Sequence, residues 1–265
     1  MLPFDRYQGF ALKRISQYRH RRQNIATVRY WEACAPWYQL WIEHNNYHRT
    51  VLDVLSDIVR PGWRVLDIGG GNGRLAASLS KLGCRTLLLE PSRAMRDLFS
   101  LEAYRQDVDG VEVESRRWED IPLSQIRGFD LILACNSLHV MSWSFRQALT
   151  KVFSVDARHV IVVAEEPYAR GLNGWNLQGY ELARSQRTDL SSSWVYHDRS
   201  QALDHAVFLK GTYFNSSETE VLFSNLIFEN GHYWLKESAR IHLNWWRNTD
   251  QGFLRKLIRR QSHES

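Results

Sequence analysis

The sequence predicts a doubly wound α/β fold built on a mostly parallel sheet, and three observations support this prediction. Segments of strand length rich in Val, Leu and Ile alternate with helical segments between residues 64 and 164. A glycine-rich turn at 69–73 follows the first of these strands and runs into a helix. The segment 129–134 is almost continuously apolar, as expected of a strand buried on both faces.

The elements of the sheet are expected in a regular order along the chain. Each helix should connect two parallel strands by a right-handed crossover, which gathers the carboxyl ends of the strands at one edge. Before the sheet, an aromatic-rich helical segment at 28–59 is closed by the turn residues Pro61 and Gly62. Strands are expected at 64–68, 85–90, 111–114, 129–134 and 159–164, with helices at 74–81, 92–101 and 143–154.

The pattern changes after Pro167. Residues 168–204 contain glycines and polar runs, and we interpret them as an inserted lid over the active site, with a helix expected at 175–187. Strands are expected next at 205–214 and 220–229, and 232–243 is expected to continue as strand or helix. The expected division of the chain is an N-terminal helical segment 1–60, a main domain 61–250 and a basic tail 251–265.

The composition is that of an ordinary globular protein. Hydrophobic residues make up 44% and charged residues 24%, and the formal net charge of +5 permits an anionic partner without requiring one. The three cysteines are far apart and form no Cys-x-x-Cys pair, which argues against a disulfide framework and a cysteine zinc site. No apolar run is long enough to span a bilayer and no secretory leader is evident, so we expect a cytoplasmic location.

The glycine turn is typical of a nucleotide-type ligand site at the carboxyl edge of a parallel sheet. Gly71-x-Gly73-x-x-Ala76 fits the loose dinucleotide pattern, and Glu90 lies about where an acid would bind ribose hydroxyls. Asp67 argues against a dinucleotide, because a buried carboxylate at this place is costly unless it is paired. A cationic ligand would supply that pairing.

Asp67-x-Gly-x-Gly-x-Gly73, followed by Glu90 at the end of Leu87-Leu88-Leu89, resembles the signature of class I S-adenosylmethionine-dependent methyltransferases. This cofactor carries a sulfonium and an ammonium group and no phosphate, so a carboxylate beneath the turn suits it. The resemblance covers roughly residues 30–235. It implies a seven-stranded sheet with a C-terminal antiparallel hairpin, S-adenosylmethionine as cofactor, and methyl transfer as the activity.

The resemblance also implies roles for individual residues of the cofactor site. The turn glycines would let the methionine half and the ribose approach the backbone, and Asp67 would lie near the amino end of the ligand. Glu90 would accept hydrogen bonds from both ribose hydroxyls. Trp118 would offer a stacking face to the adenine, and Glu119 would accept from its amine. The implied cofactor-binding set is Asp67, Gly69, Gly70, Gly71, Gly73, Glu90, Pro91, Trp118, Glu119, Asn136 and Tyr38.

The acceptor side is less defined by the sequence. His139, after the fourth strand, is expected to be a base or a substrate contact, with a structural hydrogen-bonding role as the alternative. Trp41, His44 and Glu165 are assigned to the substrate, Glu165 because it could bind an amine or another cation. His44-x-x-x-His48 has the spacing of a metal pair, but no acid follows in the zincin arrangement, so no metal site is expected.

The methyl acceptor is expected to be a small molecule, aromatic or amphipathic. The fourth strand ends in Ala134-Cys135-Asn136-Ser137, which lacks the Asn/Asp-Pro-Pro-Tyr/Phe sequence of base amino-group methylation and the Pro-Cys nucleophile of pyrimidine C5 methylation. Nucleic acid is therefore not favoured as the acceptor. The alternatives are an NAD(P)-dependent oxidoreductase, a methyltransferase acting on protein or RNA, and a cofactor-binding module without transfer activity. The oligomeric state is left open.

Overall fold

The computed structural model describes residues 27–166, 168–172 and 179–249, and the chain divides into two compact units. Of the described residues, those within 51–188 and 240–249 form one unit, here called the sheet unit, and those within 27–50 and 189–239 form the other, the appended unit. Residues of the expected insertion 168–204 therefore fall in both units. The expected tail 251–265 lies outside the described residues.

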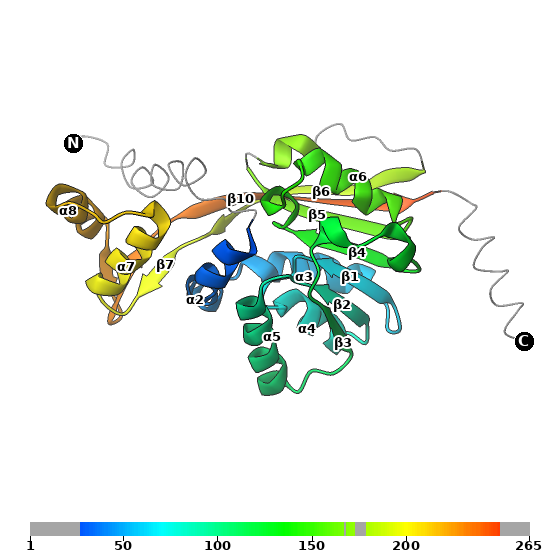
Figure 1. Ribbon diagram of the computed structural model, residues 1–265, viewed down its shortest axis with the longest axis horizontal. Helices are drawn as coiled ribbons and strands as arrows, with labels where there is room; N and C mark the ends of the chain where they lie inside the picture. Colours follow the sequence, from blue (N-terminus) through cyan, green and yellow to red (C-terminus); the bar gives the residue numbers. More distant parts are fainter. Residues whose placement is uncertain (1–26, 167, 173–178, 250–265) are drawn as a thin grey trace, which may run out of the picture. The chain divides into compact units, whose positions relative to one another are not determined.

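The sheet unit is organised around a seven-stranded sheet, which confirms the predicted fold class (Figure 1). The strand order is β3-β2-β1-β4-β5-β10-β6. The first five strands pair in parallel, and β10 runs antiparallel to β5. The bounds are β1 Arg64–Ile68, β2 Arg85–Leu89, β3 Val111–Glu114, β4 Leu131–Cys135, β5 His159–Glu165, β6 Tyr180–Ser191 and β10 Ser238–Asn248.

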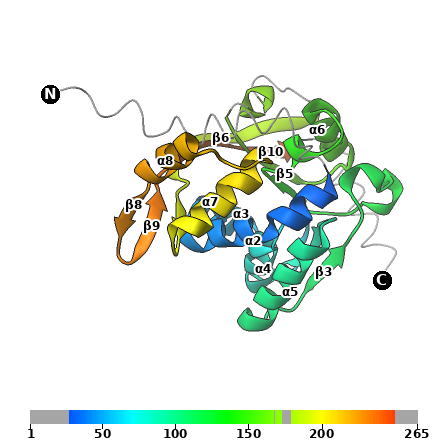
Figure 2. The same ribbon diagram turned by 60° about the vertical axis from the view of Figure 1, so that its left-hand side comes forward.

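Helices cover both faces of this sheet. Figures 1 and 2 show α6 (Phe145–Ser154) on one face, with α4 (Arg74–Lys81) and α5 (Arg93–Gln106) on the other. The core follows the alternation of side chains along each strand: Leu89 of β2 packs in the cluster that includes α6, whereas Leu88 packs in the cluster of α4 and α5. α3 (Tyr47–Ile58) precedes β1.

Local sequence explains where the two helices after β2 and β4 begin. The Ser92 hydroxyl accepts a hydrogen bond from the amide of Met95 and caps α5. Ser144 and Gln147 form a reciprocal capping box at the start of α6. Short 3₁₀ turns at Trp118–Asp120 (η2) and Leu123–Gln125 (η3) connect β3 to β4, while Leu138–Val140 (η4) follows β4. These turns place polar residues at the carboxyl edge of the sheet.

The strands expected at 205–214 and 220–229 were wrong. The structure has α7 (Arg199–Lys210) and α8 (Ser216–Ser224) there, and only Ile227–Glu229 (β8) is a strand. Asp198 caps α7 through the amide of Gln201, and Asn215 forms a capping box with Glu218 on α8. These caps specify helices, and Ala202, Leu209 and Leu222 are their buried apolar residues, together with Ala206.

The helix expected at 175–187 was also wrong over its described part, because residues 180–191 form the long strand β6. Residues 173–178 lie outside the described residues. The segment 232–243 contains β9 (His232–Leu235) and most of β10. β6 and β10 are therefore the last two strands of the main sheet, and the residues between them build much of the appended unit instead of a short hairpin turn.

The appended unit combines helices with a small antiparallel sheet. β7 (Trp194–Tyr196), β9 and β8 form this sheet in that order. The helices of the unit are α2 (Val28–His44), α7 and α8. The core of this unit is aromatic. The imidazole of His205 stacks on Trp37, with ring centroids 4.7 Å apart, and the hydroxyl of Tyr196 is hydrogen-bonded to Nδ1 of His205 over 2.8 Å. In the described part of the chain, every helix is too short or too polar to cross a membrane.

Candidate functional site

The turn between β1 and α4 has the geometry that only glycine adopts at low cost. Gly69, Gly71 and Gly73 have φ angles of 63°, 60° and 68°. A Cβ atom at Gly69 would lie 2.6 Å from the Cβ of Ser137, and one at Gly73 would overlap the ring of Phe99. The turn is closed by a bond from the Gly73 amide to the carbonyl of Gly70 over 3.0 Å. Side chains are thus excluded, and the backbone is left exposed to a ligand.

Asp67 lies beneath this turn, fully buried on β1. Neither carboxylate oxygen has a hydrogen-bond partner in the described residues. Burial raises the pKa of Asp67 to about 7, and the charge of Glu90 contributes to the same shift. A Cβ atom at Gly70 would lie 2.5 Å from Asp67 Oδ2, so the glycine is also needed to make room for the carboxylate.

Glu90, at the end of β2, joins the glycine turn to the next helix. Its Oε2 atom accepts a hydrogen bond from the amide of Gly71 over 3.0 Å, and Oε1 accepts from the amide of Ser92 over 2.8 Å. The backbone around it is held as well, because Arg96 donates to the carbonyls of Glu90 and Pro91. The carboxylate is nearly buried, with 6% of the residue exposed.

The end of β4 is shaped by Asn136 and Ser137. Asn136 has a φ of 52°, and its side-chain oxygen accepts a hydrogen bond from the amide of Glu165 over 3.0 Å. This bond fixes the carboxyl ends of β4 and β5 to each other. The hydroxyl of Ser137 is buried beside Gly69 and has no hydrogen-bond partner in the described residues. Sequence reasoning had not assigned Ser137, although its place after a strand of the sheet could have indicated it.

His139, Tyr168 and Glu165 form the next part of the edge. The ring of His139 stacks on that of Tyr168, with centroids 4.0 Å apart and an interplanar angle of 14°. Burial raises the pKa of Glu165, and burial followed by the charge of Glu165 raises that of Tyr168. Burial, with the charges of Asp67 and Glu165, raises the pKa of Cys135 as well. Tyr168 was missed from sequence, yet it lies only three residues after Glu165.

Trp118 and Glu119 are located between β3 and β4. The indole of Trp118 is 2% exposed and donates to the carbonyl of Ala148 over 3.3 Å, so its ring is part of the core. Glu119 Oε1 accepts from both the amide and the hydroxyl of Ser142, each over 2.8 Å. Glu119 thereby ties the loop after β3 to the loop after β4. Contacts of these two residues with adenine remain a prediction.

Tyr38, Trp41 and His44 belong to α2 in the appended unit. The indole of Trp41 donates to the Ser192 hydroxyl over 3.2 Å, and the centroids of Tyr38 and Trp41 are 6.1 Å apart. His44 Nδ1 bonds the carbonyl of Leu40 over 2.9 Å. Their assignment to cofactor and substrate remains a prediction. Within the described ranges, no three His, Cys, Asp or Glu side chains are grouped so that they could hold a metal ion.

Comparison with known proteins connects this geometry to a family. Residues 65–157, from β1 to just before β5, match the family described as "Methyltransferase domain". These residues form a methyltransferase domain. The match includes the glycine turn, Glu90 and the strand end at Asn136. The cofactor of this domain is S-adenosylmethionine, as the resemblance implied.

Solved structures similar to about three quarters of the chain share the fold at low sequence identity. A candidate RNA methyltransferase from Pyrococcus horikoshii is 13% identical with a TM-score of 0.52, over 79% of this chain and 88% of that one. The YcgJ protein of Bacillus subtilis is 15% identical with a TM-score of 0.48, over 77% of this chain and 99% of that one. No curated protein matches the sequence.

The residues of the methyltransferase domain fit S-adenosylmethionine on two observations. First, Asp67 offers a buried carboxylate without a hydrogen-bond partner in the described residues, which suits a cationic ligand and would be costly next to a diphosphate. Second, the glycine turn packs so closely on Ser137 and Phe99 that Cβ atoms at Gly69 and Gly73 would displace it, so glycines hold its backbone in the conformation that a nucleoside can approach. Glu90 accepts a hydrogen bond from the amide of Gly71 and so lies beside the turn, where its carboxylate can also accept hydrogen bonds from ribose hydroxyls.

Proposed function

We propose that the protein transfers the methyl group of S-adenosylmethionine to a small-molecule acceptor. The observation that carries this proposal is Asp67, a fully buried carboxylate without a hydrogen-bond partner in the described residues, beneath a turn that only glycines can form. Such a group is stabilised by a positive charge, and the cofactor provides an ammonium and a sulfonium. When bound, S-adenosylmethionine supplies a methyl group already activated for nucleophilic attack.

The protein's own contribution is alignment of the acceptor. The carboxyl ends of β4 and β5, fixed to each other by the Asn136–Glu165 bond, form a rigid edge. A nucleophile held against this edge would approach the methyl carbon in line with the departing sulfur, with water excluded. The electron pair of the broken carbon–sulfur bond remains on sulfur, and a proton leaves the acceptor if it was bound to the nucleophilic atom.

His139, Tyr168 and Glu165 support an aromatic or amine-bearing acceptor. The stacked rings of His139 and Tyr168 offer a flat surface for an aromatic group. Glu165, whose pKa burial raises, can accept a proton from an ammonium nucleophile near neutral pH better than an exposed carboxylate can. The strand end Ala134-Cys135-Asn136-Ser137 lacks the motifs of nucleic-acid base methylation, which favours a small molecule over RNA.

Ligand binding provides the first test. Thermal shift measurements with S-adenosylhomocysteine, S-adenosylmethionine and NAD should show stabilisation by the two sulfur nucleosides and none by NAD. Gly71→Val should abolish the shift by S-adenosylhomocysteine, because a β-branched residue at a φ of 60° distorts the turn. A protein that NAD stabilises and S-adenosylhomocysteine does not would overturn the assignment.

The acceptor class is tested by transfer of a labelled methyl group. The protein and labelled S-adenosylmethionine are incubated separately with a metabolite extract, total RNA and a protein extract. Label is expected in the metabolite fraction and should be lost with Gly71→Val. Label confined to RNA or protein would overturn the small-molecule proposal and leave the cofactor assignment intact.

We also propose that the protein acts in the cytoplasm. Its three cysteines are far apart in the sequence and form no Cys-x-x-Cys pair, as expected of a chain kept in a reducing compartment. Fractionation of cells that express the tagged protein would test this location, and recovery in an oxidising compartment would contradict it.

A further inference from the structure

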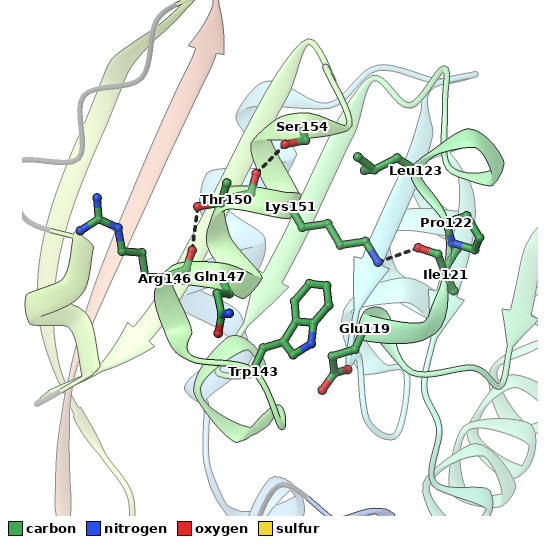
Figure 3. A pocket seen from close by; sticks show the side chains of 10 residues that line it. All are labelled: Glu119, Ile121, Pro122, Leu123, Trp143, Arg146, Gln147, Thr150, Lys151 and Ser154. Atoms are coloured by element: carbon green, nitrogen blue, oxygen red, sulfur yellow. Dashed lines mark hydrogen bonds between the residues drawn. The ribbon is translucent and has the colours of Figure 1, made fainter.

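A pocket of about 610 Å³ lies between α6 and the connection from β3 to β4 (Figure 3). One wall is the exposed face of α6, and the other is the segment from η2 to η3, with Trp143 at one end. The volume is within the range of sites for small organic ligands. The lining residues are Glu119, Ile121, Pro122, Leu123, Trp143, Arg146, Gln147, Thr150, Lys151 and Ser154. None of the glycine-turn residues lines it.

The pocket exposes apolar side chains on both sides. The indole of Trp143 is 37% exposed and Leu123 is 39% exposed, although both are large hydrophobic residues. Ile121 and Pro122 continue the wall next to Leu123. A ligand with an apolar body and a flat group would remove this surface from water, which stabilises binding by about 25 cal/mol for each Å² of apolar surface buried.

Lys151 gives the pocket its charge. Its side chain extends from α6 towards the opposite wall, as Figure 3 shows, and its ammonium donates to the carbonyls of Trp118 and Ile121, the latter over 2.6 Å. The ammonium also lies over the rings of Trp118 and Trp143, at 4.5 and 5.4 Å from their centroids. In the described residues it makes no ion pair within 4 Å, so carbonyl and ring dipoles and the more distant charges of Glu119 and Asp120 compensate a nearly buried charge.

Two further polar side chains, Gln147 and Arg146, lie on the α6 side of the pocket, away from the Lys151 ammonium (Figure 3). The side-chain oxygen of Gln147 accepts hydrogen bonds from the amide and the hydroxyl of Ser144 at the start of α6. Its NH₂ group is left as a donor at an exposed position. Arg146 adds a second positive charge on the rim. Glu119 is the opposing charge, and one of its oxygens is already bonded twice to Ser142.

We infer that this pocket binds an amphipathic organic anion, with its anionic group near Lys151 and an aromatic or aliphatic body between Trp143 and Leu123. The site is separate from the glycine turn, and it does not depend on which acceptor the enzyme methylates. Trp118 belongs to the segment that forms one wall, and its carbonyl is one of the two that Lys151 holds.

A fluorescent probe of this chemical class, 1-anilinonaphthalene-8-sulfonate, tests the inference by titration of the full-length protein. Thr150→Trp fills the pocket from an exposed helix position, and Lys151→Met removes the charge. Each should raise the dissociation constant of the probe at least about tenfold. Tyr104→Ser, at an aromatic residue that is 87% exposed on α5, serves as the matched control and should leave it unchanged.

Two further measurements make the result decisive. A thermal shift by S-adenosylhomocysteine in the Thr150→Trp variant shows that the fold and cofactor site are intact. Saturating S-adenosylhomocysteine should not displace the probe from the parent protein, because Glu119 is the one lining residue that is also assigned to the cofactor. Displacement of the probe by S-adenosylhomocysteine, or equal binding by the parent and the Thr150→Trp variant, would place the probe elsewhere and overturn the inference.

Discussion

The carboxylate of Glu90 and the amide of Gly71 are joined by a hydrogen bond of 3.0 Å across the mouth of the glycine turn. The other oxygen of the same carboxylate is bonded to Ser92, which caps α5. A single side chain therefore sets the position of the turn relative to the next helix and presents an acceptor to the ribose. Loss of this carboxylate should affect ligand binding more than it affects folding.

We expect Glu90→Ala to raise the dissociation constant for S-adenosylhomocysteine about a hundredfold. Two hydrogen bonds to a charged acceptor contribute about 1.5 kcal/mol each, and both would be lost with the side chain. Isothermal titration calorimetry gives the measurement. Glu112→Ala, an exposed acid on β3, is the control and should bind like the parent. A folded Glu90→Ala variant with unchanged affinity would contradict the assigned role.

The stability of the ligand-free protein should depend on pH through Asp67. Its pKa is about 7 in the folded state and 3.8 in the reference state, because burial and then the charge of Glu90 disfavour the carboxylate. Between about pH 4 and 7 the folded state keeps a proton that the unfolded state has released. The free energy of unfolding therefore falls as the pH rises, by about 4 kcal/mol over the whole range.

Asp67→Asn isolates this effect, because the amide has the shape of the protonated acid and does not titrate. Urea unfolding of both proteins should show the variant gaining about 3 kcal/mol relative to the parent between about pH 4.5 and about pH 7.5. The comparison removes the contributions of other groups, such as Glu165, whose pKa is also raised. Parallel stability curves for the two proteins would show that Asp67 is not buried as a carboxylate.

The first half of the fold could be predicted from sequence because its signals are local. The strand at Arg64–Ile68, the helix at Arg74–Lys81 and the glycine turn between them were placed correctly. The apolar strand near 131–135 was found because burial on both faces leaves a continuous run. Glu90 was placed beside the turn because it directly follows the apolar run Leu87-Leu88-Leu89, which forms the end of β2.

The second half could not be predicted with the same rules. A strand was expected at 205–214, whereas Asp198 caps the start of a helix at Arg199–Lys210 and Gly211 caps its end. β6 is an exposed edge strand with few apolar residues, so its pattern resembles a loop or a helix. Tyr168 was missed because its partner His139 is distant in sequence, and stacking between them depends on tertiary structure.

Lys151→Met should destabilise the sheet unit. The substitution keeps the aliphatic stem but leaves the carbonyls of Trp118 and Ile121 without their donor. Each buried carbonyl that loses its partner costs about 1–3 kcal/mol, offset in part because a nearly buried ammonium is removed, so a net loss of about 2 kcal/mol is expected. Urea unfolding measures it, and Arg146→Met, at an exposed position on the same helix, should cost under about 0.5 kcal/mol.

Alanine at Gly73 and at Gly62 should separate backbone strain from steric exclusion at the turn. Both glycines have a positive φ, 68° and 85°, so each substitution carries the strain of a left-handed residue, about 1 kcal/mol. A Cβ atom at Gly62 meets nothing within 4 Å, whereas one at Gly73 overlaps the ring of Phe99. Gly73→Ala should therefore cost about 2 kcal/mol more than Gly62→Ala in urea unfolding.

The same pair distinguishes the turn's role in binding from its role in stability. Gly73 is the N-cap of α4, and its carbonyl accepts from the amide of Ala77 over 2.8 Å, so displacement of Gly73 moves the start of the helix along with the turn. Affinity for S-adenosylhomocysteine should fall with Gly73→Ala and stay at the parent value with Gly62→Ala. Phe99→Leu combined with Gly73→Ala should recover part of both losses, because the smaller side chain gives the new methyl group room. Equal effects of the two single substitutions on stability and affinity would show that strain alone, and not the contact with Phe99, makes glycine necessary at Gly73.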